Sequence, residues 1–106
     1  MQATDLDLLT NAARKSGDIA KSYFGQSPKI WNKPDDAGPV TAADLAVNAM
    51  LLESLGGARA DYGWLSEETE DDAIRLDADT LFVVDPIDGT RSFIEGSKDW
   101  AHSLAV

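Results

Sequence analysis

The feature that most constrains this chain is the stretch Leu81–Thr90, in which four apolar residues run directly into an acidic turn. The apolar run contains two β-branched valines, and this pattern predicts a buried strand. We expect the strand to end near Asp85, because Pro86 has no N–H group to donate to a sheet ladder. The sequence therefore predicts two carboxylates, those of Asp85 and Asp88, on a tight turn at the end of a rigid strand.

The same turn offers groups that bind an anion. Gly89 permits backbone conformations that other residues resist, and such a turn leaves the N–H groups of Gly89 and Thr90 free to face a negatively charged ligand. Carboxylates that gather a hard cation, beside N–H groups that accept a phosphate, indicate metal-assisted phosphoryl chemistry. The simpler interpretation is purely structural, because Asp, Pro and Gly are ordinary turn residues.

An upstream segment favours the functional interpretation. In Tyr62–Thr69, an aromatic and apolar run again ends abruptly in acidic residues. If this run is a second strand that ends at the same edge of the sheet, it brings Glu67 close to Asp85. Two strand ends would then supply carboxylates to one place.

A further acidic position lies at the start of a helix predicted over residues 41–55. Thr41 is the expected N-cap, and Asp44 follows three residues later, which is close to a capping box. An acidic residue in the first turn of a helix is also favoured by the helix dipole without any catalytic role. Local sequence therefore leaves both roles open for Asp44.

Three motifs resemble, in the same order, those of the inositol monophosphatase superfamily, the lithium-sensitive, magnesium-dependent phosphatases. Residues 85–90 read D-P-I-D-G-T and match its D-P-[ILV]-D-G-[ST] signature. Residues 64–68, W-L-S-E-E, resemble its G/S-E-E element, and residues 39–44, P-V-T-A-A-D, resemble its P-V-T-x-A-D element. Residues 61–68 and 90–96 are most similar to the bacterial branch that includes 3′(2′),5′-bisphosphate nucleotidases.

The resemblance implies a substrate and a cofactor. The substrate is a small phosphorylated molecule, and the cofactor is Mg²⁺, with two or three ions in the intact enzyme. The implied metal ligands are the carboxylates of Glu67, Asp85 and Asp88 and the backbone carbonyl of Ile87, with Asp85 shared between two ions. Glu68 would support a metal ion through water. All of these are oxygen ligands, which a hard cation prefers.

The resemblance also implies a catalytic pair. Asp44 and Thr90 would orient a water molecule whose pKa the cation lowers, and this water would attack phosphorus in line with the departing alcohol. The N–H groups of Gly89 and Thr90 would bind the substrate phosphate. Substrate hydrolysis of this kind needs no covalent enzyme intermediate.

Other positions are assigned less specifically. In relatives, a lysine and an acidic residue on a mobile loop help to hold a metal ion, and Lys33 with Asp35 or Asp36 is a candidate for that role; a solvated surface loop is the alternative. We interpret Arg91 as a surface charge in preference to a substrate contact. We expect the His102 side chain to be packed or exposed and to have no catalytic role.

For the fold, the resemblance implies an α/β layered sandwich in which two N-terminal helices pack on a mainly antiparallel sheet. Apolar periodicity predicts helices over residues 5–24, capped by Thr4, and 41–55, stopped by Gly56 and Gly57. Strands are also expected over residues 29–33 and 100–106. Loops are expected over residues 67–79, with one helical turn among them, and over residues 91–99. The predicted apolar stripes of the helices consist of Leu6, Leu9, Ala13, Gly17, Ala20 and Phe24 in the first, and Leu45, Ala49, Leu52 and Leu55 in the second.

Length and composition narrow the interpretation further. The superfamily is considerably longer than 106 residues, and its second half carries another metal-binding aspartate. We therefore interpret residues 1–106 as the N-terminal portion of a single phosphatase domain whose C-terminal half is absent, so that the fold is incomplete. The absence of cysteine, of a secretory signal and of a membrane-spanning run fits the cytoplasm.

The net charge of −10 argues against binding to a nucleic-acid polymer. It is also unfavourable for an anionic substrate, unless a bound divalent cation reverses the sign of the charge locally.

Three alternatives remain open at this point. Haloacid-dehalogenase-like phosphatases end a strand with D-x-D-G-T and use the first Asp as a nucleophile, but here the spacing is D-x-x-D-G-T. The second alternative is a truncated fragment that binds metal, or associates with itself through exposed strand edges as in a homodimer, without turnover. The substrate can be an inositol monophosphate instead of a nucleoside bisphosphate.

Overall fold

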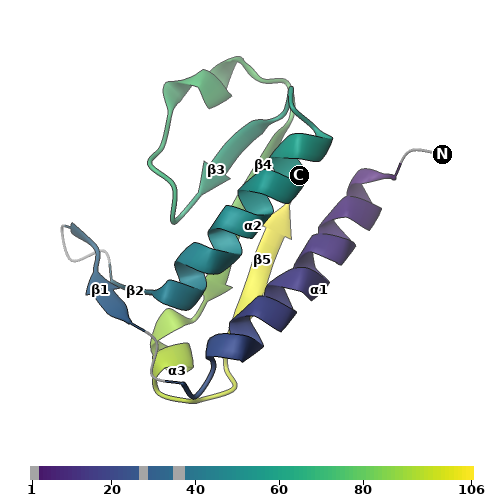
Figure 1. The fold of residues 1–106 in the computed structure, drawn as a ribbon. Coiled ribbons are helices and arrows are strands. Elements are labelled where there is room, and N and C mark those ends of the chain that lie inside the picture. Colours follow the sequence, from purple (N-terminus) through teal and green to yellow (C-terminus); the bar gives the residue numbers. More distant parts are fainter. Residues whose placement is uncertain (1–2, 27–28, 35–37) are drawn as a thin grey trace.

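The computed structural model describes residues 3–26, 29–34 and 38–106, in which two long helices form one layer beside a sheet (Figure 1). A separate hairpin and two short helices complete the fold. The elements in chain order are α1 (Asp5–Tyr23), β1 (Ile30–Asn32), β2 (Pro39–Thr41), α2 (Ala42–Ala58), β3 (Gly63–Ser66), the 3-10 helix η2 (Ala73–Asp77), β4 (Leu81–Asp88), α3 (Thr90–Ile94) and β5 (Ala101–Ala105).

The strands form a hairpin, β1–β2, and a three-stranded sheet in the order β3–β4–β5. Two of the three pairings are antiparallel, β1 with β2 and β4 with β5, whereas β3 runs parallel to β4. α1 and α2 lie side by side over one face of the sheet (Figure 1). The expected α/β class is therefore confirmed, and the parallel pair brings the carboxyl ends of β3 and β4 to the same edge.

Both long helices begin as local sequence predicts. Thr4 accepts a hydrogen bond from the N–H of Asp7, and the carboxylate of Asp7 accepts one from the N–H of Thr4. Thr41 and Asp44 form the same reciprocal capping box at the start of α2. These caps satisfy N–H groups that have no partner within their own helix.

The predicted apolar stripe of α1 is confirmed in part, and that of α2 is largely wrong. In α1, Ala20 is fully buried and Leu9 and Phe24 pack against the core as expected, whereas Leu6 is exposed and the helix also buries Ala12 and Ser16. Within α2 the predicted stripe is wrong except at Leu55. The residues that α2 buries are Ala43, Asp44, Val47, Asn48, Leu51 and Leu55, while Leu45 and Leu52 are about two-fifths exposed at 41% and 44%.

The reason lies in the composition of α2. Apolar residues surround this helix on nearly all sides, so periodicity alone does not select the face that meets the sheet. Phe82 and Val84 of β4 point into the core that this face covers, and Ile87 and Phe93 extend it. Gly56 and Gly57 do not stop the helix as expected, because α2 continues to Ala58.

Two boundaries near the acidic turn also differ from prediction. β4 continues past Pro86 to Asp88, because the pairing with β5 shifts register between Asp85 and Asp88 and leaves Pro86 in the irregular part. The Pro86 carbonyl there contacts Nδ1 of the half-buried His102, which gives that histidine a packing role. The predicted loop after Thr90 begins instead with the helix α3.

The other face of the three-stranded sheet has no covering layer among the described residues. Val83, which points away from α1 and α2, is 44% exposed. It lines a hollow of about 510 Å³ together with Leu65 and Ala105, and Glu67 and Asp85 border the same hollow.

Candidate active site

The carboxyl ends of β3 and β4 open into a cavity of about 330 Å³. Every site residue predicted from the acidic turn lines this cavity, and Glu67 joins them from the end of β3. The lining consists of Lys33, Gly38, Pro39, Glu67, Asp85, Ile87, Asp88, Gly89, Thr90, Arg91 and Ser92.

Strand pairing explains why Glu67 and Asp85 meet. Ser66 lies opposite Val84 in the parallel register, and the N–H of Glu67 donates to the Val84 carbonyl at 3.2 Å. The next residue of each strand is therefore acidic at the same level of the sheet. The two side chains face a common cavity and do not point to opposite sides of the molecule.

Asp85 carries a carboxylate that its surroundings do not satisfy. Its Oδ1 is buried and has no hydrogen-bond partner among the described residues. Burial raises the pKa of Asp85 to about 6, and the negative charges of Glu67, Asp88 and Glu68 add to the rise, while Lys33 opposes it. An uncompensated carboxylate of this kind is a position where a cation would be stabilising.

The acidic residues are neighbours, but they do not already form a coordination shell. Within residues 3–26, 29–34 and 38–106, no three acidic or histidine side chains stand together as a metal-binding cluster. Asp88 is exposed at the end of β4, and its carboxylate raises the pKa of Asp85 by repulsion. Like charges repel, so we expect Glu67, Asp85 and Asp88 to converge only around a cation.

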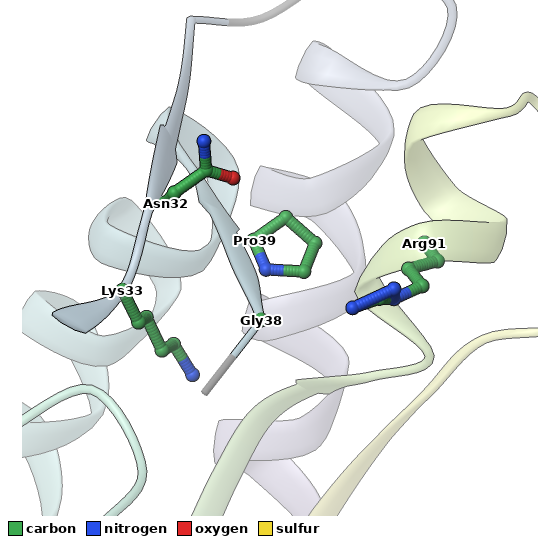
Figure 2. Close-up of a pocket in the computed structure, with 5 residues that line it drawn as sticks. All are labelled: Asn32, Lys33, Gly38, Pro39 and Arg91. Carbon is green, nitrogen blue, oxygen red and sulfur yellow. The ribbon is translucent and has the colours of Figure 1, made fainter. Parts of the chain in front are cut away.

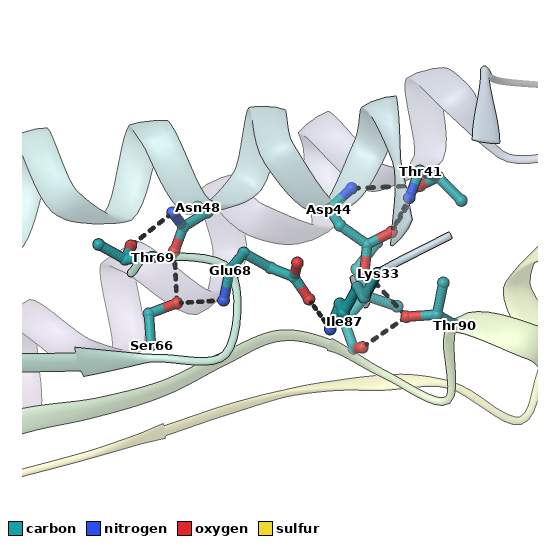
Figure 3. A network of polar contacts seen from close by, with 9 residues as sticks. All are labelled: Lys33, Thr41, Asp44, Asn48, Ser66, Glu68, Thr69, Ile87 and Thr90. Carbon is teal, nitrogen blue, oxygen red and sulfur yellow. Dashed lines mark hydrogen bonds and ion pairs between the residues drawn. The ribbon is translucent and has the colours of Figure 1, made fainter. Parts of the chain in front are cut away.

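Thr90, which lines the cavity, meets Asp44 in a network of polar contacts (Figure 3). The Thr90 hydroxyl lies 2.8 Å from Asp44 Oδ1. Asp44 is fully buried, and its Oδ2 accepts hydrogen bonds from the Thr41 hydroxyl at 2.6 Å and the Thr41 N–H at 2.8 Å. The capping box of α2 thus fixes one carboxylate oxygen and leaves the other for Thr90.

The Thr90 hydroxyl has two possible acceptors and one proton. Besides Asp44 Oδ1, the Ile87 carbonyl lies 3.1 Å from Thr90 Oγ1. A hydroxyl donates one hydrogen bond at a time, so donation to Asp44 leaves the Ile87 carbonyl available to another partner. The backbone carbonyl that the sequence singled out therefore lies directly beside the catalytic candidates.

Gly89 cannot be replaced without strain. Its φ is +90°, and a Cβ at this position would lie 2.8 Å from the carbonyl oxygen of Asp99. Only glycine fits both constraints. The sharp turn at Gly89 starts α3 with Thr90 as its first residue, and N–H groups in a first helical turn lack partners within the helix.

Lys33 and Glu68 form an ion pair that sequence reasoning did not foresee. Lys33 Nζ lies 2.6 Å from Glu68 Oε1, and the Glu68 side chain is only 5% exposed. Burial raises the pKa of Glu68 although Lys33 opposes the rise. Burial by itself lowers the pKa of Lys33, but the hydrogen bond and charge of Glu68 outweigh it and raise that pKa. Asp35 and Asp36 lie outside the described residues.

A second polar network supports the turn that carries Glu67 and Glu68 (Figure 3). The Ser66 hydroxyl donates to Asn48 Oδ1 at 2.6 Å and accepts a hydrogen bond from the N–H of Glu68 at 3.2 Å. Asn48 Nδ2 donates to Thr69 Oγ1 at 2.9 Å. The signal available in the sequence was the spacing of Asn48, one turn after Asp44 on the same helix.

The fold is that of a known protein class. The family model described as the inositol monophosphatase family matches residues 1–106, so the chain belongs to that family. It is 42% identical over 106 residues to the 3′-phosphoadenosine 5′-phosphate phosphatase of Mycobacterium leprae, covering 99% of this chain and 38% of that protein. It is 34% identical over 103 residues to the 3′(2′),5′-bisphosphate nucleotidase CysQ of Salmonella typhimurium, covering 95% and 42%.

A solved structure agrees with these sequence matches. The extragenic suppressor protein suhB of Bartonella henselae superposes with a TM-score of 0.84 at 31% identity, over 94% of this chain and 39% of that one. The chain therefore spans about two-fifths of the length of the relatives that it matches. Within the described residues, every helix is too short or too polar to cross a bilayer.

Proposed function

We propose that the full-length protein is a Mg²⁺-dependent phosphomonoesterase that removes the 3′(2′)-phosphate of a nucleoside bisphosphate. Two curated relatives, 42% and 34% identical to this chain, carry names that describe such an activity. The observation that carries the proposal is the common cavity of Glu67, Asp85 and Asp88 with the hydrogen-bonded pair of Thr90 and Asp44.

The donor set fits a hard divalent cation. The cavity offers three carboxylates and a backbone carbonyl, all oxygen, with no sulfur or imidazole among the lining residues. The buried, unpartnered Oδ1 of Asp85 is the group that a cation would satisfy best. We infer that Glu67, Asp85, Asp88 and the Ile87 carbonyl hold Mg²⁺, and the number of ions, two or three, belongs to the same proposal. When bound, Mg²⁺ supplies electrostatic stabilisation and lowers the pKa of a coordinated water.

The residues of this chain then have separate tasks. Before the reaction, the Thr90 hydroxyl donates a hydrogen bond to Asp44 Oδ1, and its Oγ1 can accept a hydrogen bond from the attacking water. As the water oxygen forms its bond to phosphorus, its proton can pass to Thr90 Oγ1 while the Thr90 proton passes to Asp44 Oδ1. The ester P–O bond breaks, the departing ester oxygen takes up a proton from solvent, and inorganic phosphate and a nucleoside 5′-phosphate result. The N–H groups of Gly89 and Thr90 bind the phosphate oxygens.

Asp44 suits this task because its position is fixed. Three hydrogen bonds hold its buried carboxylate, two at Oδ2 and one at Oδ1. A base that is already oriented needs little reorganisation during the reaction. The same bonds keep the Thr90 hydroxyl at the cavity wall.

The decisive experiment compares two substrates on the full-length protein. Phosphate release from 3′-phosphoadenosine 5′-phosphate and from inositol 1-phosphate is measured with Mg²⁺, each with and without Li⁺. We expect faster turnover of the nucleotide than of inositol 1-phosphate, and inhibition by Li⁺. The Asp85→Asn variant should hydrolyse neither substrate, while its circular dichroism spectrum stays unchanged. Faster turnover of inositol 1-phosphate would reverse the substrate assignment, and a trapped phosphoryl group on Asp85 would replace the mechanism with nucleophilic catalysis.

Three further inferences accompany the activity. We infer that residues 1–106 form the N-terminal portion of a single phosphatase domain, which accords with the length of the relatives and with the uncovered face of the sheet at Val83. We also propose a cytoplasmic location and, for the full-length protein, a homodimer. Size-exclusion chromatography with light scattering tests the last of these.

A further inference from the structure

A second polar cavity lies next to the carboxylate cavity. It has a volume of about 480 Å³ and is lined by Asn32, Lys33, Gly38, Pro39 and Arg91. Figure 2 shows the side chains of Lys33 and Arg91 directed toward Gly38 from opposite sides. A Cβ built on Gly38 would lie 3.9 Å from Arg91 Nη2, so the guanidinium reaches the backbone of the β1–β2 hairpin. This wall presents cations and an amide in place of carboxylates.

The two cations of this cavity differ in how they are engaged. Lys33 pairs with Glu68 at 2.6 Å. For Arg91, the part of the chain that the structure describes provides no ion pair and no side-chain hydrogen bond. The chain has only 9 basic residues against 19 acidic ones, yet two of the nine line one cavity. A planar guanidinium with five donors is well suited to bind phosphate in a bidentate manner.

Arg91 stands on a well-anchored element. It belongs to α3, whose Phe93 is 2% exposed and packs edge-on against both Phe24 and Trp100. The N–H of Glu95 donates to the Arg91 carbonyl at 3.0 Å and closes the helical turn. A side chain that projects from a packed element positions a ligand more precisely than one on a free loop.

The two cavities have Lys33, Gly38, Pro39 and Arg91 in common. A ligand held by the carboxylate end of the first cavity therefore meets both basic side chains along the wall that the two cavities share. We infer that Arg91, assisted by Lys33 and Asn32, forms a second anion subsite for the phosphate that is not hydrolysed. Arg91, which is exposed, thereby acts as a specificity-determining residue for bisphosphates and has a role beyond that of the expected surface charge. The inference rests on the proposed function for the identity of the nucleotide.

The kinetic test uses the full-length protein and two nucleotides that differ by one phosphate, adenosine 3′,5′-bisphosphate and adenosine 3′-monophosphate. We expect Arg91→Gln to raise KM for the bisphosphate about 10- to 100-fold, which is the usual effect of losing a charge-assisted hydrogen bond. KM for the monophosphate and kcat for both should change less than about twofold. Arg91→Lys should recover part of the loss. Arg14→Gln, exposed on α1, is the matched control.

A binding experiment separates this inference from the proposed function. Isothermal titration calorimetry without Mg²⁺ compares the affinities of the same two nucleotides. We expect the wild-type protein to bind the bisphosphate more tightly and Arg91→Gln to lose that preference, whether or not either nucleotide is hydrolysed. The inference is overturned if the wild type shows no preference, if the preference survives in Arg91→Gln, or if that variant weakens both nucleotides equally.

Discussion

Thr90 and Asp44 are 46 positions apart in the sequence, yet the Thr90 hydroxyl lies 2.8 Å from Asp44 Oδ1. The contact joins the first residue of α3 to the first turn of α2. Two helix starts thus meet at one cavity, and a residue that caps a helix also takes part in the candidate catalytic pair.

The first prediction concerns this contact. Thr90→Val keeps the size of the side chain but removes the hydroxyl, so kcat of the full-length enzyme should fall about 10²- to 10⁴-fold while KM changes little. Thr90→Ser should keep most of the activity. Thr90→Val also leaves Asp44 Oδ1 without its hydrogen-bond partner, and we expect its free energy of unfolding to fall by about 1–3 kcal/mol. Steady-state kinetics and urea denaturation measure the two effects, and unchanged kcat in Thr90→Val would remove Thr90 from the reaction.

The second prediction uses the pKa of Asp85. Because this pKa is raised to about 6 from an ordinary value of 3.8, the folded protein holds a proton that the unfolded chain releases between about pH 4 and 6. The contribution of Asp85 to stability therefore decreases as pH rises through this window and stays low above it. In metal-free protein, the free energy of unfolding of Asp85→Asn minus that of the wild type should therefore increase as the pH rises from 4 to 7.

The control for this experiment is the cation itself. Mg²⁺ at pH 7.5 should raise the Tm of the wild type by favouring the ionised folded state. It should raise the Tm of Asp85→Asn much less, whereas Asp77→Asn on the exposed 3-10 helix η2 should respond like the wild type. Equal Mg²⁺ responses in all three proteins would show that Asp85 does not hold the ion.

The third prediction compares one substitution at two glycines. Gly89→Ala forces a side chain into a φ of +90° and against the Asp99 carbonyl at 2.8 Å, so it should destabilise the protein by about 1–3 kcal/mol. Gly17→Ala lies within α1 with no atom within 4 Å of the new methyl group, and it should stabilise by about 0.5–1 kcal/mol. Thermal denaturation of both variants tests the opposite signs, and a stabilising Gly89→Ala would contradict the geometry of the turn.

The fourth prediction concerns Lys33 and Glu68. Lys33→Met leaves the nearly buried Glu68 carboxylate without its cation and should lower the free energy of unfolding by about 2–3 kcal/mol. Adding Glu68→Gln should restore part of this loss, with a coupling energy of about 1–3 kcal/mol in a double-mutant cycle. Lys15→Met, exposed on α1, controls for the loss of a lysine. Strict additivity of the two substitutions would mean that the pair does not form in solution.

Local sequence was informative wherever the physics is local. The caps at Thr4 and Thr41 and the strand that leads into Asp85 follow from nearby residues. The extension of β4 past Pro86 did not, because it depends on a register shift against β5, a strand that comes later in the chain. The buried face of α2 was missed for another reason, since apolar residues on several sides of that helix make its periodicity uninformative.

The candidate site shows the same division. Motifs indicated Asp44, Glu67, Asp85, Asp88 and Thr90, and the structure places all but the buried Asp44 directly in the lining of one cavity, with Asp44 hydrogen-bonded to Thr90. The pairing of Lys33 with Glu68 and of Ser66 with Asn48 joins segments far apart in the chain. No spacing rule predicts such pairs, because they depend on how the hairpin and α2 pack beside β3.

The parallel pairing of β3 with β4 has a consequence for how this chain tolerates insertions and deletions. The hydrogen-bonded ladder, and not the segment between the strands, sets the relative positions of Glu67 and Asp85. Residues 70–79, which follow the hydrogen-bonded Thr69, can therefore gain or lose length without moving either carboxylate. A shift of one residue in the pairing register would instead turn one of these side chains to the opposite face of the sheet. The site would then be lost although the sequence motifs were unchanged.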